Sequence, residues 1–495
     1  MPFVEHAGEP SSGNWVKQLS PMLLLFLWIG AGCAVGPDFR PPAAEVPAAW
    51  SGAAPEPSAQ ISAVLDAPAE VARWWRSFND PGLNSLVDRG LQANLDLRLA
   101  TARTRQARAA RAVGAAALWP TVDGSTVYSR SGTGNSAAKT GSRGTSIGSS
   151  ASATDLFQVG LDAAWELDLF GGNRRSVEAL DADLQAAVED RRAVMVSLVS
   201  EVGLNYFTLR GLQQQIVIAE GNLASQKKTV DITRTRFETG FVSGLDVANA
   251  SAQAASTASR IPVLDSAARE AIHTLSVLLG AEPNALLDEL QIAAPIAPVP
   301  PAVPVGLPSE LLRRRPDIRR AEAQIHAATA RIGVATADLF PKFSLTGSVN
   351  FAGDTLSSAA NWNSRAWSLG PGVQWRIFDA GRIRWNIEVR NALQEQAVLT
   401  YQQTVLTALK EVETALVAFA REQEHRMLLE EAVRQNSKAV QLAMQLYTAG
   451  QTDFLNVLSA QGALFTSEDA LVQSTRALSV DLLALYKALG GGWEG

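Results

Sequence analysis

The sequence predicts a mainly helical protein with two pairs of amphipathic β-strands. Strict alternation of apolar and polar residues predicts strands at 343–351 and 367–377. Earlier in the chain, a weaker pattern predicts a strand at 122–128 and a clean one predicts a strand at 157–169. Four strands are too few to close a barrel, so several chains would have to pool them. An aromatic-rich apolar face opposite a polar, charged face suits a water-filled barrel in lipid. The alternative is a pair of surface hairpins packed on helices.

Long helices flank each pair of strands. Residues 172–238 contain no proline, and their apolar residues recur at helical spacing, which predicts one helix about 100 Å long. A glycine-containing turn at 239–244 ends it. A shorter helix returns over 245–280, in which Pro262 is expected to introduce a kink. Such a length exceeds what a compact domain needs and is typical of a coiled coil or a tunnel wall.

The second half of the chain repeats this plan. A helix at 309–338 precedes the second strand pair, a proline-free helix covers 383–447, and a return helix covers 454–489. The halves align at an offset of about 210, which pairs the residues Gly240 with Gly450, Leu245 with Leu455, and Trp165 with Trp375. The predicted helix at 83–118 and the return helix 245–280 together match the length of one long helix. Two short helices stacked end to end would therefore give columns of equal height, as a cylinder wall requires.

This organisation divides the chain into five parts. Residues 1–32 form a signal peptide, 33–82 an extended N-terminal segment, 83–291 the first repeat, 292–308 a proline-rich connector, and 309–490 the second repeat.

Composition excludes several classes of function. The net charge of −6 gives no footprint for nucleic acid, and no apolar run reaches 18 residues, so no transmembrane helix is expected. The four histidines are scattered, and no nucleophile, metal or phosphate-binding motif is present. We therefore expect neither an enzyme nor a cofactor or metal site.

Cys33 is the only cysteine in the chain. It follows an apolar signal core at 22–29 and the small residues at 30–32, a position that predicts lipid attachment after signal removal. Gly30 departs from the usual lipoprotein pattern, and the alternative is a chance cysteine in a discarded signal. Ala34, rather than aspartate, follows the cysteine, which favours delivery to the outer membrane.

Several motifs together make the chain resemble the TolC-like outer membrane efflux proteins, in particular their lipoprotein branch. The motifs that carry this resemblance are Cys33-Ala34-Val35-Gly36-Pro37-Asp38-Phe39, Trp74-Trp75 through Pro81, Trp165-Glu166-Leu167-Asp168-Leu169-Phe170-Gly171, Leu307-Pro308 through Ile318, Phe340-Pro341, Trp375-Arg376-Ile377-Phe378-Asp379-Ala380-Gly381, and the two turns near Gly240 and Gly450. They cover essentially the whole chain after the signal.

The resemblance implies a homotrimer in which twelve strands form one outer-membrane barrel. The barrel would be continuous with a periplasmic barrel of twelve helical columns. It also implies a periplasmic adaptor and an inner-membrane RND-type pump as partners, contact with outer-membrane lipid, and passive export of small molecules and drugs. The outer duct of a type I protein-secretion system and a periplasmic coiled-coil scaffold without a pore are the alternatives.

The turns farthest from the strands carry the predicted functional residues. The resemblance places a gate there, and an acidic ring in a narrow tube favours cations, so Asp453 and Asp246 are the candidates. The alternative is that each caps a helix. Seven turn residues are expected to contact the adaptor: Gly240, Phe241, Val242, Ser243, Gly450, Gln451 and Thr452. For Phe241 and Val242, contact between neighbouring tips is the competing interpretation.

Four tryptophans are candidates for aromatic girdles at the membrane surfaces. They are Trp119, Trp165, Trp367 and Trp375. The alternative is ordinary packing where strands join helices.

Overall fold

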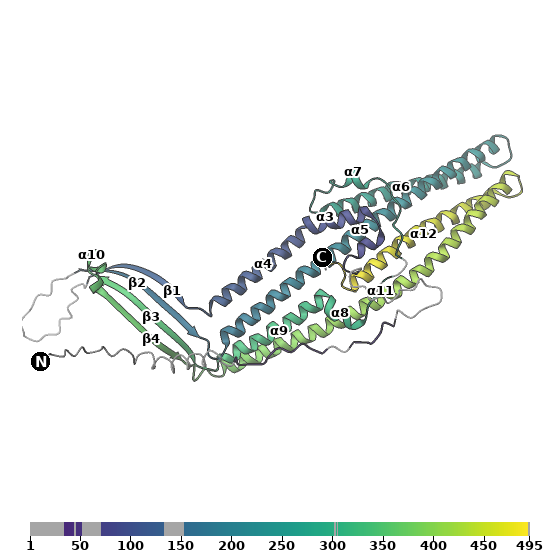
Figure 1. Cartoon of the computed structure of the whole chain (residues 1–495). Helices are drawn as coiled ribbons and strands as arrows, with labels where there is room; N and C mark the ends of the chain where they lie inside the picture. The colour runs from purple at the N-terminus through teal and green to yellow at the C-terminus, as the bar shows by residue number, and fades with distance from the viewer. Residues whose placement is uncertain are drawn as a thin grey trace, which may run out of the picture. The chain divides into compact units, whose positions relative to one another are not determined.

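The computed structural model describes residues 34–43, 46–51, 71–132, 153–300, 303 and 305–493. The predicted signal peptide and Cys33 lie outside these residues. The chain divides into two compact units (Figure 1). The strand unit comprises Met1–Arg40, Ala107–Leu184 and Gln324–Ala397, and the helix unit comprises Pro41–Gln106, Gln185–Ala323 and Val398–Gly495.

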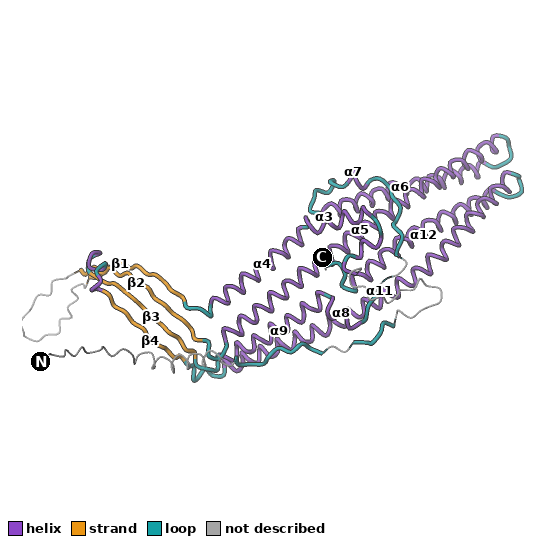
Figure 2. The backbone as a smooth tube through the Cα atoms, viewed as in Figure 1, coloured by secondary structure: helices purple, strands orange, loops and turns teal. Residues whose placement is uncertain are grey.

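The described part of the strand unit contains one antiparallel sheet of four strands. All four predicted strands are present, although the last ends at Gln374 rather than at 377. The strands are β1 (Thr121–Gly132), β2 (Ala153–Leu167), β3 (Lys342–Gly353) and β4 (Arg365–Gln374), and they pair in the order β1-β2-β3-β4 (Figure 2). β1 and β4 are therefore the two edges of this sheet. The loop between β3 and β4 holds the short helices α10 (Leu356–Ala359) and η2 (Trp362–Ser364), which the sequence pattern did not predict.

The strand register separates an apolar face from a polar face. Trp165 lies opposite Leu345, whereas Asp162 lies opposite Asp123 on one side and Ser348 on the other. The polar face carries Asp123, Gln158, Asp162, Glu166, Ser344, Ser348, Asn350 and Ser368. Because side chains alternate along a strand, the opposite face carries the aromatic and branched apolar residues.

The two long helices are confirmed. They are α5 (Gly172–Glu238) and α11 (Arg382–Thr448), each of 67 residues. Each is followed by a returning helix of 35 residues, α6 (Gly244–Leu278) and α12 (Phe454–Ala488). α6 continues through Pro262, so the proline removes a main-chain hydrogen bond without ending the helix. None of the helices among the described residues combines the length and apolar character needed to cross a membrane.

Two helices predicted as single elements are each divided in two. The helix expected at 83–118 consists of α3 (Pro81–Ala93) and α4 (Leu95–Ala116), and the one expected at 309–338 consists of α8 (Pro308–Arg314) and α9 (Pro316–Ala337). Pro316 explains the second break, because the residue before a proline avoids helical geometry. The first break was missed because Asn94 has no proline beside it. The elements η1 (Trp74–Phe78) and α7 (Leu287–Leu290) were not predicted either.

Both breaks lie where a short helix meets the end of a returning helix. Asn94 accepts a hydrogen bond from the N–H of Leu97 at 2.9 Å, and its amide donates to the carbonyl of Leu278 at the end of α6 at 2.8 Å. Arg315 likewise donates to the carbonyl of Ala488 at the end of α12 at 2.9 Å. At each break, a polar side chain therefore binds a carbonyl at the end of a returning helix.

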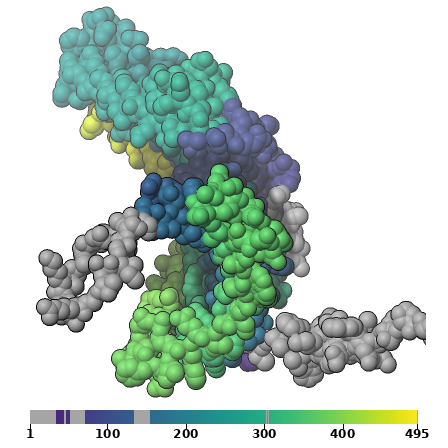
Figure 3. Space-filling view, turned by 90° about the vertical axis from the view of Figure 1, so that its left-hand side faces the viewer, coloured from purple at the N-terminus to yellow at the C-terminus, as the bar shows by residue number. Residues whose placement is uncertain are grey.

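The core of the helix unit is aromatic and aliphatic. Trp74 is fully buried and stacks on Tyr486 with ring centroids 5.5 Å apart. Tyr206 donates to the carboxylate of Asp80 at 2.7 Å, and Asp80 in turn caps α3. In the space-filling view, teal residues from the middle of the chain lie above yellow residues from its C-terminal part (Figure 3).

Candidate functional site

The candidate site consists of the two turns that join α5 to α6 and α11 to α12 in the helix unit. Both long helices end with the same backbone motif. Gly240 donates to Phe237 and Phe241 to Arg236 at the first turn. Gly450 and Gln451 repeat this pattern at the second. Both glycines have positive φ (80° and 73°), which L side chains rarely adopt, so the sequence-predicted glycine stops are explained by geometry.

Arg236 links the ends of the two long helices. Its guanidinium donates to the carbonyls of Tyr447 and Thr448, and it lies 4.6 Å from the centre of the Tyr447 ring. The last carbonyls of a helix lack partners within the helix and carry the negative end of its dipole. The guanidinium of Arg236 therefore provides hydrogen-bond donors to the last carbonyls of α11 and also holds α11 to α5.

A small apolar cluster lies beneath the turns. Its buried members are Ala250, Tyr447, Phe454 and Val457, and Val242 packs against it. Phe241, the next residue along the turn, is 75% exposed. The two residues predicted to contact an adaptor thus differ: Val242 packs against this apolar cluster, whereas Phe241 leaves its ring on the surface.

The two candidate gate residues also differ in their contacts. The carboxylate of Asp246 accepts hydrogen bonds from the backbone N–H and the hydroxyl of Ser243, both at 3.1 Å, as in a capping box. Asp453 occupies the N-cap position of α12, is exposed, and makes no side-chain capping bond. The carboxylate of Asp246 therefore helps to begin a helix, whereas that of Asp453 is exposed.

Polar side chains at intervals of seven residues join α5 to the second hairpin. Gln215 donates to Asp469 at 2.6 Å, Asn222 donates to Glu468 at 2.7 Å, and Thr229 accepts from Gln461 at 3.0 Å. Arg236 is the next residue in this series. A period of seven keeps side chains on one face of a coiled helix pair. We call these four residues of α5 the polar seam.

The positions between the seam residues are buried but small or polar. They are Ala219, Gln226 and Thr233. Both amide atoms of Gln226 lack a hydrogen-bond partner among the described residues. Apolar side chains normally occupy such positions in a coiled coil and provide most of its stability. Hydrogen bonds therefore contribute to the contact between α5 and α12 beside the apolar clusters.

The four candidate girdle tryptophans lie in the strand unit. The indole N–H groups of Trp165 and Trp375 donate at 3.0 Å to the carbonyls of Leu118 and Leu339, where a helix turns into a strand. Trp119 and Trp367 are largely exposed, and Trp367 lies near the opposite end of its strand. Trp375 combines its junction hydrogen bond with a ring that is 57% exposed, so only Trp165 is partly buried at a junction.

Sequence reasoning missed Arg236 and the rest of the polar seam. Each of these residues is ordinary on a solvated helix face, so composition gave no reason to select them. The seven-residue spacing of Gln215, Asn222, Thr229 and Arg236 was the available signal, but it becomes informative only when the partners on α11 and α12 are known.

Comparisons with known proteins agree on one family. The family model described as "Outer membrane efflux protein" matches residues 86–281 and 307–491. The pyoverdine export outer membrane protein OpmQ of Pseudomonas aeruginosa is 35% identical over 89% of this chain and 92% of its own length. The cation efflux system protein CusC of Escherichia coli O6:H1 is 32% identical over 96% and 100%. The solved outer-membrane channel OprN is 37% identical, with a TM-score of 0.84 over 94% of this chain and 100% of that one.

Proposed function

Since the chain belongs to the outer membrane efflux protein family, we propose that three copies assemble into one passive channel through the outer membrane. The protein is the outer membrane channel component of an efflux pump. Family members are channel proteins, so the energy for transport comes from a partner. The observation that best supports a trimer is the sheet, whose two edge strands are open.

The open edges require partner strands in a membrane. Unpaired backbone groups at an edge have no water to bind within lipid, so a membrane sheet must close. The four strands among the described residues, with β1 and β4 at the edges, close into twelve when the β1 of one copy pairs with the β4 of the next. The polar face, with Asp123, Asp162 and Glu166, then lines the pore, and the apolar face meets lipid.

Cysteine cross-linking tests this closure. One cysteine at Thr126 in β1 is combined in turn with each position of β4 from Arg365 to Gln374. Within one chain the two edges are separated by three strand spacings, about 14 Å, which is too far for a disulfide. Oxidation should therefore give covalent oligomers up to a trimer at a subset of positions. A chain that stays monomeric at every position would contradict the arrangement.

The proposed gate lies at the two turns. The polar seam, which includes Arg236, holds the α11–α12 hairpin to α5 through hydrogen bonds, which can exchange with water when the hairpins separate. Three copies of Asp453 would form an acidic constriction that favours cations. Asp246 is the weaker candidate, because its carboxylate is engaged by Ser243.

The same turns are the proposed docking surface for a periplasmic adaptor, which would connect the channel to an inner-membrane RND-type pump. Phe241 and Leu245 are 75% and 67% exposed at the first turn, and Leu455 is 67% exposed at the second. Exposed apolar residues at a tip favour a protein partner. The remaining candidates, Ser243, Gly450, Gln451 and Thr452, surround these residues along the chain.

Cys33 is the proposed site of lipid attachment. It lies outside the described residues, but its neighbour Ala34 contacts Gly171 in the turn between β2 and α5. In a membrane-embedded sheet that turn would lie at the lipid surface, where an acyl chain could insert. Intact mass measurement of the mature protein tests this proposal, because lipidation and signal removal change its mass in a defined way.

The two halves of the chain are proposed to be structural repeats with the boundaries predicted from the sequence. Equivalent contacts support this proposal. Trp165 and Trp375 make the same bond to a junction carbonyl, and the turns at Gly240 and Gly450 share one backbone motif.

A further inference from the structure

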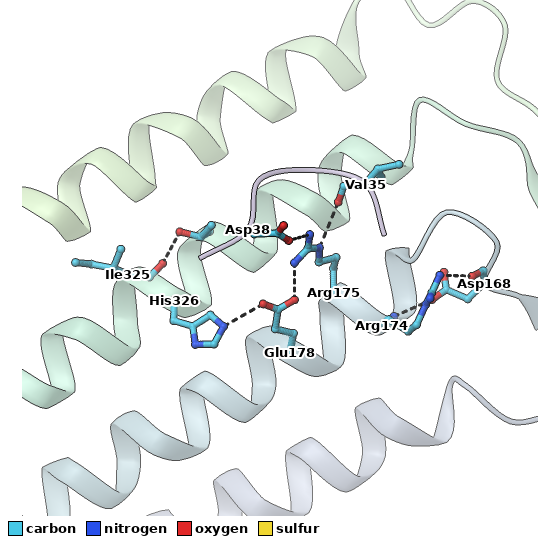
Figure 4. A network of polar contacts seen from close by, with 9 residues as sticks. Val35, Asp38, Asp168, Arg174, Arg175, Glu178, Ile325 and His326 are labelled. Carbon is cyan, nitrogen blue, oxygen red and sulfur yellow. Dashed lines mark hydrogen bonds and ion pairs between the residues drawn. The ribbon is translucent and has the colours of Figure 1, made fainter. Parts of the chain in front are cut away.

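The segment that follows Cys33 is docked on the strand unit by main-chain hydrogen bonds. The N–H of Val35 donates to the carbonyl of Phe170 at 3.1 Å. The carbonyl of Val35 accepts from Nε of Arg175 at 3.3 Å (Figure 4). Both main-chain groups of one residue are thus engaged by the β2–α5 turn and the first turn of α5.

Two glycines determine the register of this segment. Gly36 has a φ of 93°, and a Cβ at this position would lie 2.5 Å from the Cα of Gly333 on α9. A Cβ on Gly333 would in turn lie 2.9 Å from the carbonyl oxygen of Val35. Both distances are shorter than any normal contact. A shift of the segment by one residue would bring Val35 or Pro37 to this crossing, where neither fits.

Arg175 connects the segment to the helices. Its side chain is only 7% exposed and donates to Asp38 at 2.6 Å and to Glu178 at 2.8 Å. Burial would lower the pKa of Arg175, but the hydrogen bonds that Arg175 donates to Asp38 and Glu178 outweigh it and raise the pKa above its usual value. A buried guanidinium is stable only when its donors are satisfied, so it retains these acceptors strongly.

The contacts extend to α9. His326 bonds to the other carboxylate oxygen of Glu178 at 3.0 Å, and Phe39 stacks on the His326 ring with centroids 4.4 Å apart. Figure 4 shows Arg175 between Val35, Asp38 and Glu178, with His326 directed at the same Glu178. The segment is therefore bound at three successive places: Val35, Gly36, and Asp38 with Phe39.

We propose that Arg175 is the positioning residue that holds the segment Ala34–Arg40 in a single register on the strand unit. It thereby fixes the N-terminal attachment point beside the β2–α5 turn. The docking comes from protein contacts, so it is independent of lipid. Its consequence for anchoring rests on the proposed lipidation of Cys33.

Hydrogen exchange of the full-length protein in detergent tests this proposal. The amide of Val35 should exchange slowly in the wild type. Arg175→Gln should raise its exchange rate at least tenfold, because the carbonyl of Val35 and Asp38 lose their donor. The matched control is Arg111→Gln, which removes an arginine paired with Asp181 in the same unit but away from the segment. This control should leave the Val35 rate unchanged.

Two further variants keep the test decisive if Arg175→Gln does not fold. Asp38→Asn changes an exposed side chain, so it should not disturb folding. Gly36→Ala introduces the Cβ that Gly333 excludes. Each should accelerate Val35 exchange while the amides of α5 stay protected. Free-peptide exchange of Val35 in the wild type, or unchanged exchange in all three variants, would overturn the proposal. Intact mass of the same samples reports lipidation separately, so failed lipidation and failed docking are distinguishable.

Discussion

Arg236 of α5 donates a hydrogen bond to the carbonyl of Tyr447 at the end of α11 and covers the Tyr447 ring with its guanidinium. The two residues are 211 apart in the sequence. One side chain thus joins the ends of both long helices, at the end of the helix unit where the gate is proposed. Arg236 provides hydrogen-bond donors to the last carbonyls of α11. If the two hairpins separate to open the channel, water can take the place of these donors.

The first prediction concerns this contact. Arg236→Gln removes the charge that holds α11 to α5, so the hairpins should separate more readily and the mean single-channel conductance in planar bilayers should rise severalfold. Arg234→Gln is the control, because it removes the same charge from an exposed position two residues away. Equal conductance for the two variants would show that Arg236 does not restrain the channel.

The second prediction separates the two acidic candidates. Asp453→Ala should raise single-channel conductance and reduce the preference for cations, because its exposed carboxylate makes no capping bond. Asp246→Ala should leave ion preference unchanged and instead destabilise the start of α6 by about 1 kcal/mol, since its carboxylate binds the N–H of Ser243. Reversal potentials in a salt gradient measure the preference. An unaltered reversal potential for Asp453→Ala would remove it from the gate.

The third prediction concerns the junction of α8, α9 and α12. Arg315→Gln should lower the free energy of unfolding by about 3 kcal/mol, because it leaves Asp317 and the carbonyl of Ala488 without the buried guanidinium. Arg89→Gln breaks an exposed pair with Glu289 and should cost less than about 1 kcal/mol. Denaturant unfolding of both variants measures the difference. Similar losses in the two would contradict the structural role of Arg315.

The fourth prediction is a pH dependence of the docked N-terminal segment. The hydrogen bond and charge of Arg175 hold the pKa of Asp38 below its usual 3.8. A lowered carboxyl pKa means that docking is favoured by ionised Asp38 above that value and weakened as the pH falls through the lower, docked pKa. Protection of the Val35 amide, corrected for intrinsic exchange, should decline in that range. In Asp38→Asn the same decline should be absent, and a decline of equal size there would contradict the assignment.

Much of the fold follows from residue patterns. Alternation in 343–351 and 157–169 predicted strands because the sheet has one apolar and one polar face, and the absence of proline in 172–238 predicted a helix of the observed length. Only one of the two helix breaks is predictable from the sequence. Pro316 marks one, but the break at Asn94 depends on a carbonyl of Leu278, 184 residues away.

The candidate site was predictable only where a feature depends on residues that are close together in the sequence. Gly240 and Gly450 indicate helix ends from the sequence, because a positive φ favours glycine. The bond from Arg236 to Tyr447 and the packing of Gly36 on Gly333 join distant segments, and nothing in their immediate neighbourhoods distinguishes them. Aspartate at a helix start was ambiguous for the same reason, since only the contacts show that Asp246 binds Ser243 and that Asp453 makes no capping bond.

Native mass spectrometry of the detergent-purified protein tests the central claim most directly, because the sheet has two open edges and only pooled strands can close it. The account predicts a complex of three copies that survives release from the detergent micelle. A single copy, stable in buffer without detergent, would contradict it.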